Sequence, residues 1–125
     1  EQINECNNKI KKITGVSPIL FRPPYGDYNN SVVEAVKSSN MYCIQWDVDS
    51  LDWKNPAPKD IVSRVTSKVK PGSIVLFHNG AKNTPEALPK VIETLQSQGY
   101  QIVPVSQLIY KDGYKIDNAG MQVKD

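Results

Sequence analysis

The sequence contains one histidine and two cysteines among its 125 residues, and this scarcity limits the metal chemistry open to it. A catalytic zinc centre needs about three protein ligands and an open position. No spacing of these residues is typical of such a site. We expect Cys6, in a helical pattern, and Cys43, in a strand pattern, to be small buried apolar side chains, although a disulfide between them stays open.

The sequence also lacks a charge excess and a long apolar run. Its 15 basic and 13 acidic residues give a formal net charge of +2, and the basic residues are scattered, which excludes a phosphate-tracking stripe for nucleic acid. No apolar stretch approaches the roughly 20 residues that span a bilayer. With 39% hydrophobic and 22% charged residues, the composition is that of a globular domain with a core.

Apolar residues recur at helical spacing in four segments, and four short apolar runs lie between or after them. The predicted helices carry their apolar faces over residues 3–13, 32–36, 61–69 and 88–95. Asn29 or Asn30 would cap the second helix, Pro58 would begin the third, and Thr84 would cap the fourth. The predicted strands cover residues 19–21, 42–46, 73–77 and 100–105, and residues 47–57 are expected to form a long loop.

Helices that alternate with continuous apolar strands indicate an α/β fold, with parallel strands and outer helices. Four such strands are about half of an eight-stranded (β/α) barrel, and an open four-stranded sheet is the alternative. From Lys111 onward the chain is polar, and Asp112-Gly113 is a hairpin-type turn signal. The chain opens at Glu1 inside an amphipathic helix with no signal peptide, so we expect a piece of a longer protein.

Unusual polar and aromatic residues follow the predicted strands, at the edge where parallel α/β folds place their active sites. Because the strands are parallel, we expect the side chains that follow three of them to lie at one mouth. These are Arg22 and Tyr25 after the first strand, Asp52 and Trp53 after the second, and His78 after the third.

Three motifs at these strand ends resemble those of the polysaccharide deacetylases of carbohydrate esterase family 4, the NodB-homology domain. Arg22–Tyr25 is similar to the third motif of that family, Asp49–Trp53 to the fourth and Ile74–His78 to the fifth, and the match runs from about Gln2 to Ile109. The resemblance implies that residues 1–110 are the C-terminal part of a deacetylase domain, forming the C-terminal half of a distorted (β/α) barrel. Residues 111–125 would be a polar C-terminal tail or an edge hairpin.

The resemblance implies an N-deacetylase acting on N-acetylated polysaccharide, either peptidoglycan or a chitin-like glycan. His78 would protonate the departing amine, and Asp52 would hold His78 and favour its imidazolium form. The amide N–H of Tyr25, on a loop stiffened by prolines, would stabilise the oxyanion. Arg22 would pair with a catalytic aspartate outside this chain. The remaining expected contacts to substrate are those of Trp53 and Leu76 with the acetyl methyl group, and that of Pro24.

The resemblance also implies parts that this chain does not contain. The base and the ligands of a divalent metal, which we expect to be zinc, belong to motifs further upstream, and no residue here is predicted to be a metal ligand. Asp47 and Asp49 could bind a hard cation, but we expect the two carboxylates at this strand end to point to opposite faces. We therefore expect the chain to be inactive without the N-terminal half of the same domain. The substrate class implies an extracellular or cell-envelope location.

Three other functions compete with this interpretation. A non-catalytic carbohydrate-binding domain on the same scaffold could stack Trp53, Tyr25 and Tyr28 on sugar rings. A serine hydrolase is a weaker hypothesis, because no Gly-x-Ser-x-Gly elbow is present and Ser50 and Ser73 lie in unsuitable contexts. An interaction protein that merely uses the scaffold is the third, since fold alone does not fix function.

Overall fold

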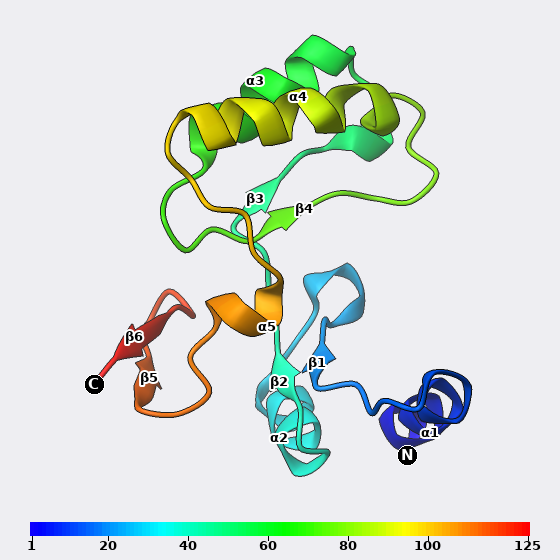
Figure 1. The fold of residues 1–125 in the computed structure, drawn as a ribbon. Helices are drawn as coiled ribbons and strands as arrows, with labels where there is room; N and C mark the ends of the chain where they lie inside the picture. The colour runs from blue at the N-terminus through cyan, green and yellow to red at the C-terminus, as the bar shows by residue number, and fades with distance from the viewer. The chain divides into compact units, whose positions relative to one another are not determined.

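The computed structural model describes residues 1–125, which divide into two compact units, Glu1–Gln45 and Trp46–Asp125 (Figure 1). The chain alternates helices with short strands, and two of its three strand pairs are parallel, which confirms the mixed α/β class with parallel strands. This division does not test the boundary expected at residue 110, which stays a prediction.

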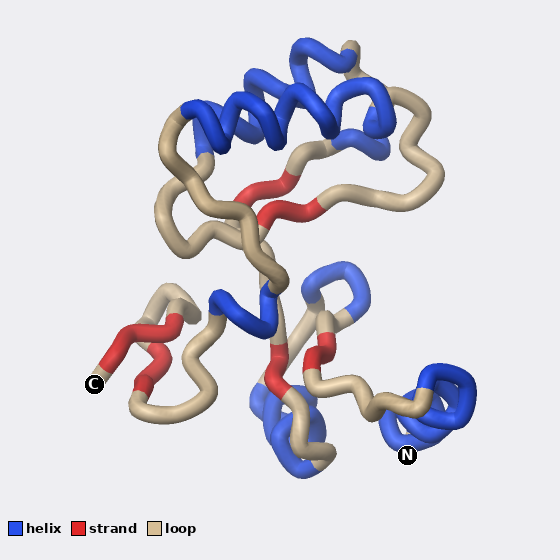
Figure 2. Tube along the Cα trace, viewed as in Figure 1, coloured by secondary structure: helices blue, strands red, loops and turns tan.

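The elements are short, as Figure 2 shows for the strands in red. The α-helices are α1 (Gln2–Thr14), α2 (Asn30–Ser38), α3 (Pro58–Lys68), α4 (Thr84–Ser97) and α5 (Val105–Leu108). Two 3-10 turns are η1 (Pro24–Gly26) and η2 (Asp52–Lys54). The strands are β1 (Leu20–Phe21), β2 (Tyr42–Cys43), β3 (Val48–Asp49), β4 (Val75–Leu76), β5 (Tyr114–Ile116) and β6 (Gln122–Lys124).

In the first unit, the parallel pair β1–β2 packs with α2. Leu20 faces Tyr42 across the pair, and the fully buried Val36 anchors α2. Asn29 caps this helix as predicted, because its Oδ1 accepts the amide N–H of Val32 at 3.0 Å. The strand and its helix therefore position the η1 loop, which follows β1 directly.

The apolar stripe of the first helix is mostly exposed, with Ile10 38% and Ile13 84% exposed. α1 ends at Gly15, which adopts a left-handed conformation with φ 78° and donates its N–H to the carbonyl of Lys11. No residue of α1 is buried, and Cys6 is exposed while Cys43 is half-buried. The expectation of a buried Cys6 is thus wrong, and both cysteines are free thiols.

In the second unit, α3 and α4 lie side by side and cover the parallel pair β3–β4 (Figure 1). Val48 of β3, Val65 of α3, and Val91 and Leu95 of α4 form one buried apolar cluster. Pro58 occupies the first turn of α3, as predicted from its fixed φ and missing donor. The cluster fixes the strand ends from which the candidate site extends.

The strand expected over residues 42–46 is shorter in the structure, and a separate strand follows it. β2 ends at Cys43, and β3 covers Val48–Asp49, a segment that we expected to be loop. The reason is pairing: β2 bonds to β1, whereas β3 bonds to β4. The expected strand over residues 100–105 is also wrong. Pro104 has no N–H for a ladder, and the chain turns into α5 after it.

Two local predictions at helix and turn positions also need correction. The N-cap of α4 is Asn83 rather than Thr84, whose hydroxyl has another partner. The polar tail does form an antiparallel hairpin, β5–β6, but its turn is not Asp112-Gly113. The turn follows β5 instead, where the Asp117 carboxylate accepts the amide N–H groups of Ala119 and Met121, each at 2.9 Å.

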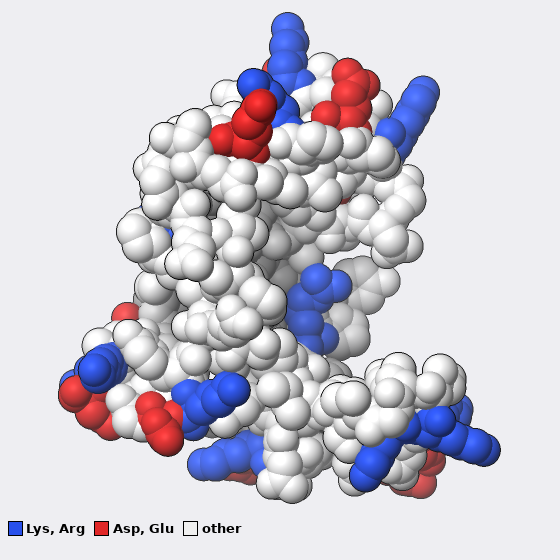
Figure 3. Space-filling view, viewed as in Figure 1, with Lys and Arg blue, Asp and Glu red and all other residues white.

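Basic and acidic side chains are mixed over α3 and α4 on the face that Figure 3 shows. Every helix of the structure is too short or too polar to reach across a lipid bilayer.

We predict that Ile61→Ala destabilises the protein by about 2–5 kcal/mol, because Ile61 is fully buried on α3 and its removal leaves a cavity. Urea unfolding followed by circular dichroism measures this change. The matched control is Ile92→Ala on α4, where the side chain is 37% exposed and the loss should be much smaller. Equal losses at the two positions would contradict the assignment of the core.

Candidate active site

Asp52 and His78 form a close pair at the ends of two neighbouring strands. Asp52 begins η2 just after β3, and His78 follows β4, so the parallel pairing of β3 with β4 brings the two residues to one edge. The Nδ1 atom of His78 lies 2.7 Å from Oδ1 of Asp52, and the backbone N–H of His78 donates to Oδ2 at 2.9 Å. The proximity expected from parallel strands is therefore present.

A strained turn between β3 and η2 directs the Asp52 side chain inward. Leu51 has φ 53°, a left-handed conformation that costs an L-residue roughly 1–2 kcal/mol. Two hydrogen bonds hold the turn: Asp49 Oδ1 accepts the Leu51 N–H at 2.9 Å, and Ser50 Oγ accepts the Asp52 N–H at 3.3 Å. As a result Asp52 is fully buried. Aspartates are almost never fully buried unless they have a partner.

The buried Asp52 carboxyl is ionised at neutral pH. Burial pushes the pKa of Asp52 upward, because it disfavours the charged form. Hydrogen bonds from the His78 amide, the Thr84 hydroxyl, the His78 ring and Ser50 act the other way and prevail, so the pKa lies below its ordinary value. The carboxylate can only accept hydrogen bonds, so the proton between the two side chains belongs to Nδ1 of His78.

The second ring nitrogen of His78 remains open. Nε2 has no hydrogen-bond partner in the chain, and the His78 side chain is 35% exposed. An imidazole held at Nδ1 by a buried carboxylate, with Nε2 turned to a solvent-accessible edge, can deliver or accept a proton there.

Thr84 is the residue that sequence reasoning missed. Its hydroxyl donates to Oδ2 of Asp52 at 2.6 Å, from the first position of α4. A threonine beside Pro85 at a helix start is typical of a cap, and that local rule concealed a contact with a residue 32 positions earlier. The signal in the sequence that could have indicated this contact is the position of the Thr84 hydroxyl, at the end of the loop that follows His78.

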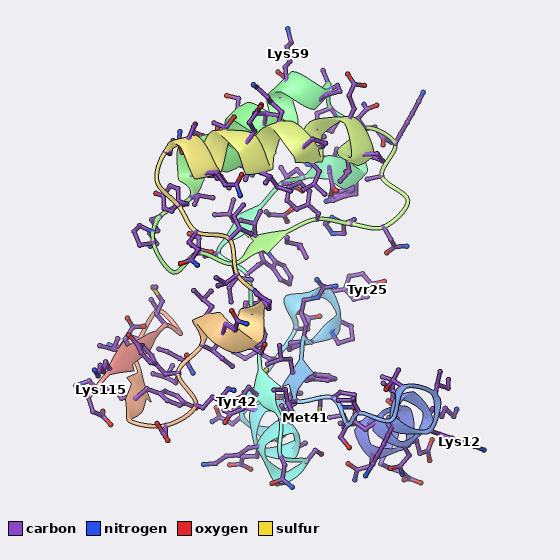
Figure 4. The ribbon with its side chains drawn as sticks, viewed as in Figure 1. Lys12, Tyr25, Met41, Tyr42, Lys59 and Lys115 are labelled. Atoms are coloured by element: carbon purple, nitrogen blue, oxygen red, sulfur yellow. The ribbon has the colours of Figure 1, made fainter.

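The η1 loop of the first unit carries Arg22, Pro24 and Tyr25. Tyr25 adopts a left-handed conformation with φ 57°, and its amide N–H donates to no acceptor in the chain. The loop is anchored by the buried Pro23 and by the Gly26 N–H, which donates to the Pro23 carbonyl at 3.1 Å. The Tyr25 ring is 97% exposed and projects from the loop (Figure 4).

Arg22 is exposed and makes no ion pair in the chain. The Arg22 guanidinium and the Tyr25 N–H are therefore both available to hydrogen-bond acceptors outside this chain. The convergence of Arg22, Pro24 and Tyr25 with the Asp52–His78 pair stays a prediction.

The two apolar residues proposed for the substrate groove differ in exposure. Trp53 is 55% exposed on η2, and the ammonium of Lys54 lies 5.2 Å from the centre of its ring. Leu76 is buried within β4, with 6% of its surface exposed. Trp53 is thus free to meet a ligand, whereas Leu76 belongs to the packed strand and its predicted contact with substrate is untested.

Asp47 and Asp49 do not form a metal centre, and the chain contains no group of three potential ligands. Asp47 accepts the Ser73 hydroxyl at 2.8 Å and the Ile74 N–H at 2.7 Å, while Asp49 accepts the Leu51 N–H. Each therefore serves a local structural purpose. The expectation of opposite directions on one strand is wrong, because residues two apart on a strand share a face and Asp47 lies before β3.

Neither serine considered as a nucleophile hydrogen-bonds to His78. The Ser50 hydroxyl accepts the Asp52 N–H, and the Ser73 hydroxyl donates to Asp47. Because a serine hydrolase needs its nucleophile within hydrogen-bond reach of the base, the structure gives this hypothesis no support.

Comparison with known proteins identifies clear relatives. The family described as polysaccharide deacetylase matches residues 1–44. Peptidoglycan-N-acetylmuramic acid deacetylase PdaC of Bacillus subtilis is 41% identical over 108 residues, which cover 86% of this chain and 22% of that protein. A peptidoglycan-N-acetylglucosamine deacetylase of Bacillus cereus is 39% identical over 97 residues, or 74% of this chain and 46% of the relative. The chain thus spans less than half of either relative.

Among solved structures, a family 4 carbohydrate esterase pseudoenzyme from Bacillus anthracis superposes with a TM-score of 0.80 at 36% identity, covering 84% of this chain and 37% of that chain. A mutant of the same protein, described as having restored enzymatic activity, gives a TM-score of 0.81 at 37% identity. Similar folds in this group therefore carry both active and inactive sites.

We predict that Asp52→Asn destabilises the protein by about 1.5–3 kcal/mol at pH 7, because a buried, hydrogen-bonded charge is lost. Since the folded-state pKa of Asp52 is lowered, its stabilising contribution is complete above about pH 4 and disappears as pH falls through the folded-state value. Urea unfolding of both proteins from pH 7 to pH 2 should show the difference shrinking toward acid. Asp112→Asn, in the exposed tail, is the control, and a pH-independent difference for Asp52→Asn would contradict the account.

Proposed function

Because this chain belongs to the polysaccharide deacetylase family, we propose that it forms the C-terminal part of a domain that removes N-acetyl groups from peptidoglycan. Two relatives whose matched segments cover most of this chain are named as peptidoglycan deacetylases, which supports peptidoglycan over a chitin-like glycan. The parallel pairs β1–β2 and β3–β4 would be consecutive parts of one distorted (β/α) barrel, completed by the N-terminal half of the same domain.

The observation that carries this proposal is the Asp52–His78 pair with a free Nε2. Hydrolysis of an acetamide stalls unless the departing amine is protonated, because an amide anion is a very poor leaving group. His78 would give the proton from Nε2 to the sugar nitrogen as the C–N bond breaks. Asp52 keeps the other proton on Nδ1 and stabilises the imidazolium before the transfer.

The η1 loop would supply the group that meets the developing negative charge. The Tyr25 N–H has no partner in the chain and is held by a loop with two prolines, so it is available to donate to an oxyanion without first rearranging. Arg22 would pair with the catalytic aspartate of the N-terminal half. Trp53, Leu76 and Pro24 would contact the sugar and its acetyl group, with the exposed Trp53 ring the best placed for stacking.

Members of this family are generally metal-dependent, but the residues of this chain do not fit a metal centre. Its single histidine is held by Asp52, and the carboxylates Asp47 and Asp49 are taken up by local hydrogen bonds. The metal ligands, which we expect to hold zinc, and the catalytic base would therefore belong to the N-terminal half. Peptidoglycan as substrate implies action in the cell envelope or outside the cell.

A second candidate is a non-catalytic domain that binds glycan. The structure of a pseudoenzyme superposes on this chain with a TM-score of 0.80, so the fold by itself does not guarantee turnover. The exposed rings of Trp53, Tyr25 and Tyr28 could serve such binding. Glycan binding without acetate release by the complete protein would favour this candidate.

We predict that His78→Gln lowers the rate of acetate release from peptidoglycan by about 10²–10⁴-fold in the complete protein, because the leaving amine loses its proton donor. Lys115→Gln, an exposed change on β5, is the control and should leave the rate unchanged. Acetate is measured enzymatically, with chitin oligomers as a parallel substrate. Full activity of His78→Gln would rule out the proposed role of the histidine.

We predict that residues 1–125 alone release no acetate from peptidoglycan, with or without added zinc, because the chain contains no group that could hold the metal. Activity should return when the N-terminal half of the domain is added as a separate polypeptide. Robust hydrolysis by residues 1–125 with zinc alone would defeat the proposal that essential groups lie in the other half.

A further inference from the structure

Among the groups that donate a hydrogen bond to the Asp52 carboxylate, Thr84 is the one that lies on a helix, at the start of α4. Its Oγ1 lies 2.6 Å from Oδ2 of the fully buried carboxylate. The backbone N–H of His78 donates to the same oxygen at 2.9 Å, whereas Nδ1 of His78 meets the other oxygen, Oδ1, at 2.7 Å. The two carboxylate oxygens thus have different partners.

We propose that Thr84 is a positioning residue that fixes the rotation of the Asp52 carboxylate, and thereby keeps the neutral His78 ring in the form with its proton on Nδ1. The effect on the ring follows from the contacts alone, while any effect on catalysis rests on the proposed function.

The physical reason is the softness of a carboxylate rotation. The terminal torsion of aspartate has a broad preference, so one backbone donor does not determine where both oxygens point. A second donor on Oδ2 opposes rotation and leaves Oδ1 directed at Nδ1. The N-terminal position of Thr84 on α4 adds a favourable field for the negative charge.

The loops around the site have other hydrogen bonds that do not involve Thr84. The Lys82 N–H donates to Oδ1 of Asn55 at 3.2 Å, and the Asn83 side-chain amide donates to the Pro56 carbonyl at 2.8 Å. These bonds tie the loop after His78 to the loop after η2. Loss of the Thr84 hydroxyl should therefore leave the fold in place while releasing the carboxylate.

The test uses Thr84→Val, which keeps the shape of the side chain but removes the hydroxyl, and Thr84→Ser, which restores it. Thr66→Val is the matched control, because the Thr66 hydroxyl donates to the Val62 carbonyl at 2.9 Å on α3, away from Asp52. Nitrogen-15 NMR of the complete protein at alkaline pH reports which ring nitrogen of His78 carries the proton. Comparison with His78→Gln identifies the signals.

We expect the unmutated protein, Thr84→Ser and Thr66→Val to show the Nδ1–H form of His78 alone. Thr84→Val should show a clear fraction of the Nε2–H form. In deacetylation assays, Thr84→Val should lower kcat by about 10–100-fold with KM unchanged, because one hydrogen bond to a charged group is lost and Thr84 does not touch the substrate. Thr84→Ser should recover kcat.

Folded Thr84→Val with only the Nδ1–H form would overturn the inference, as would the same change in Thr66→Val. If Thr84→Val does not fold, the hydroxyl proton of Thr84 in the unmutated protein decides: slow exchange with water supports the bond, and rapid exchange contradicts it. Should the unmutated protein release no acetate while the ring behaves as expected, the proposed function fails and the positioning role stands.

Discussion

The site depends on one buried negative charge. A carboxylate with none of its surface exposed is tolerated only because donors surround it, and at Asp52 they come from the end of β4 and the start of α4. The Asp52 N–H in turn donates to the Ser50 hydroxyl in the β3–η2 turn. Each donor therefore also ties one of these segments to the others. The Asp52 carboxylate that holds these segments together also keeps the proton on Nδ1 of His78. One buried charge therefore contributes both to the fold and to the proposed chemistry.

This arrangement explains why a single histidine suffices for the role we propose. A free imidazole exchanges its proton between two nitrogens, but a buried carboxylate at Nδ1 leaves only Nε2 for chemistry. The η1 loop offers a complementary feature, an unpaired N–H at Tyr25 held in a left-handed conformation. In our proposal, one group supplies a proton and the other receives developing charge, and the rest of the reaction belongs to the N-terminal half.

Sequence reasoning succeeded where local chemistry decides the outcome. Asn29 caps α2, Pro58 begins α3, and parallel strands bring Asp52 to His78. It failed where distant pairing decides, because nothing near Val48 shows that β4 will be its partner. The prediction for Thr84 failed for the same reason. Its neighbours in the sequence indicate a helix cap, whereas its hydroxyl partner is a carboxylate 32 residues away that only the folded chain brings close.

The most direct test is a crystal structure of the complete protein with an N-acetylated glycan bound. Our account predicts Nε2 of His78 within about 3 Å of the acetamide nitrogen, and the Tyr25 N–H directed at the carbonyl oxygen. A glycan bound with its acetamide far from His78, or an imidazole turned away from Asp52, would contradict it.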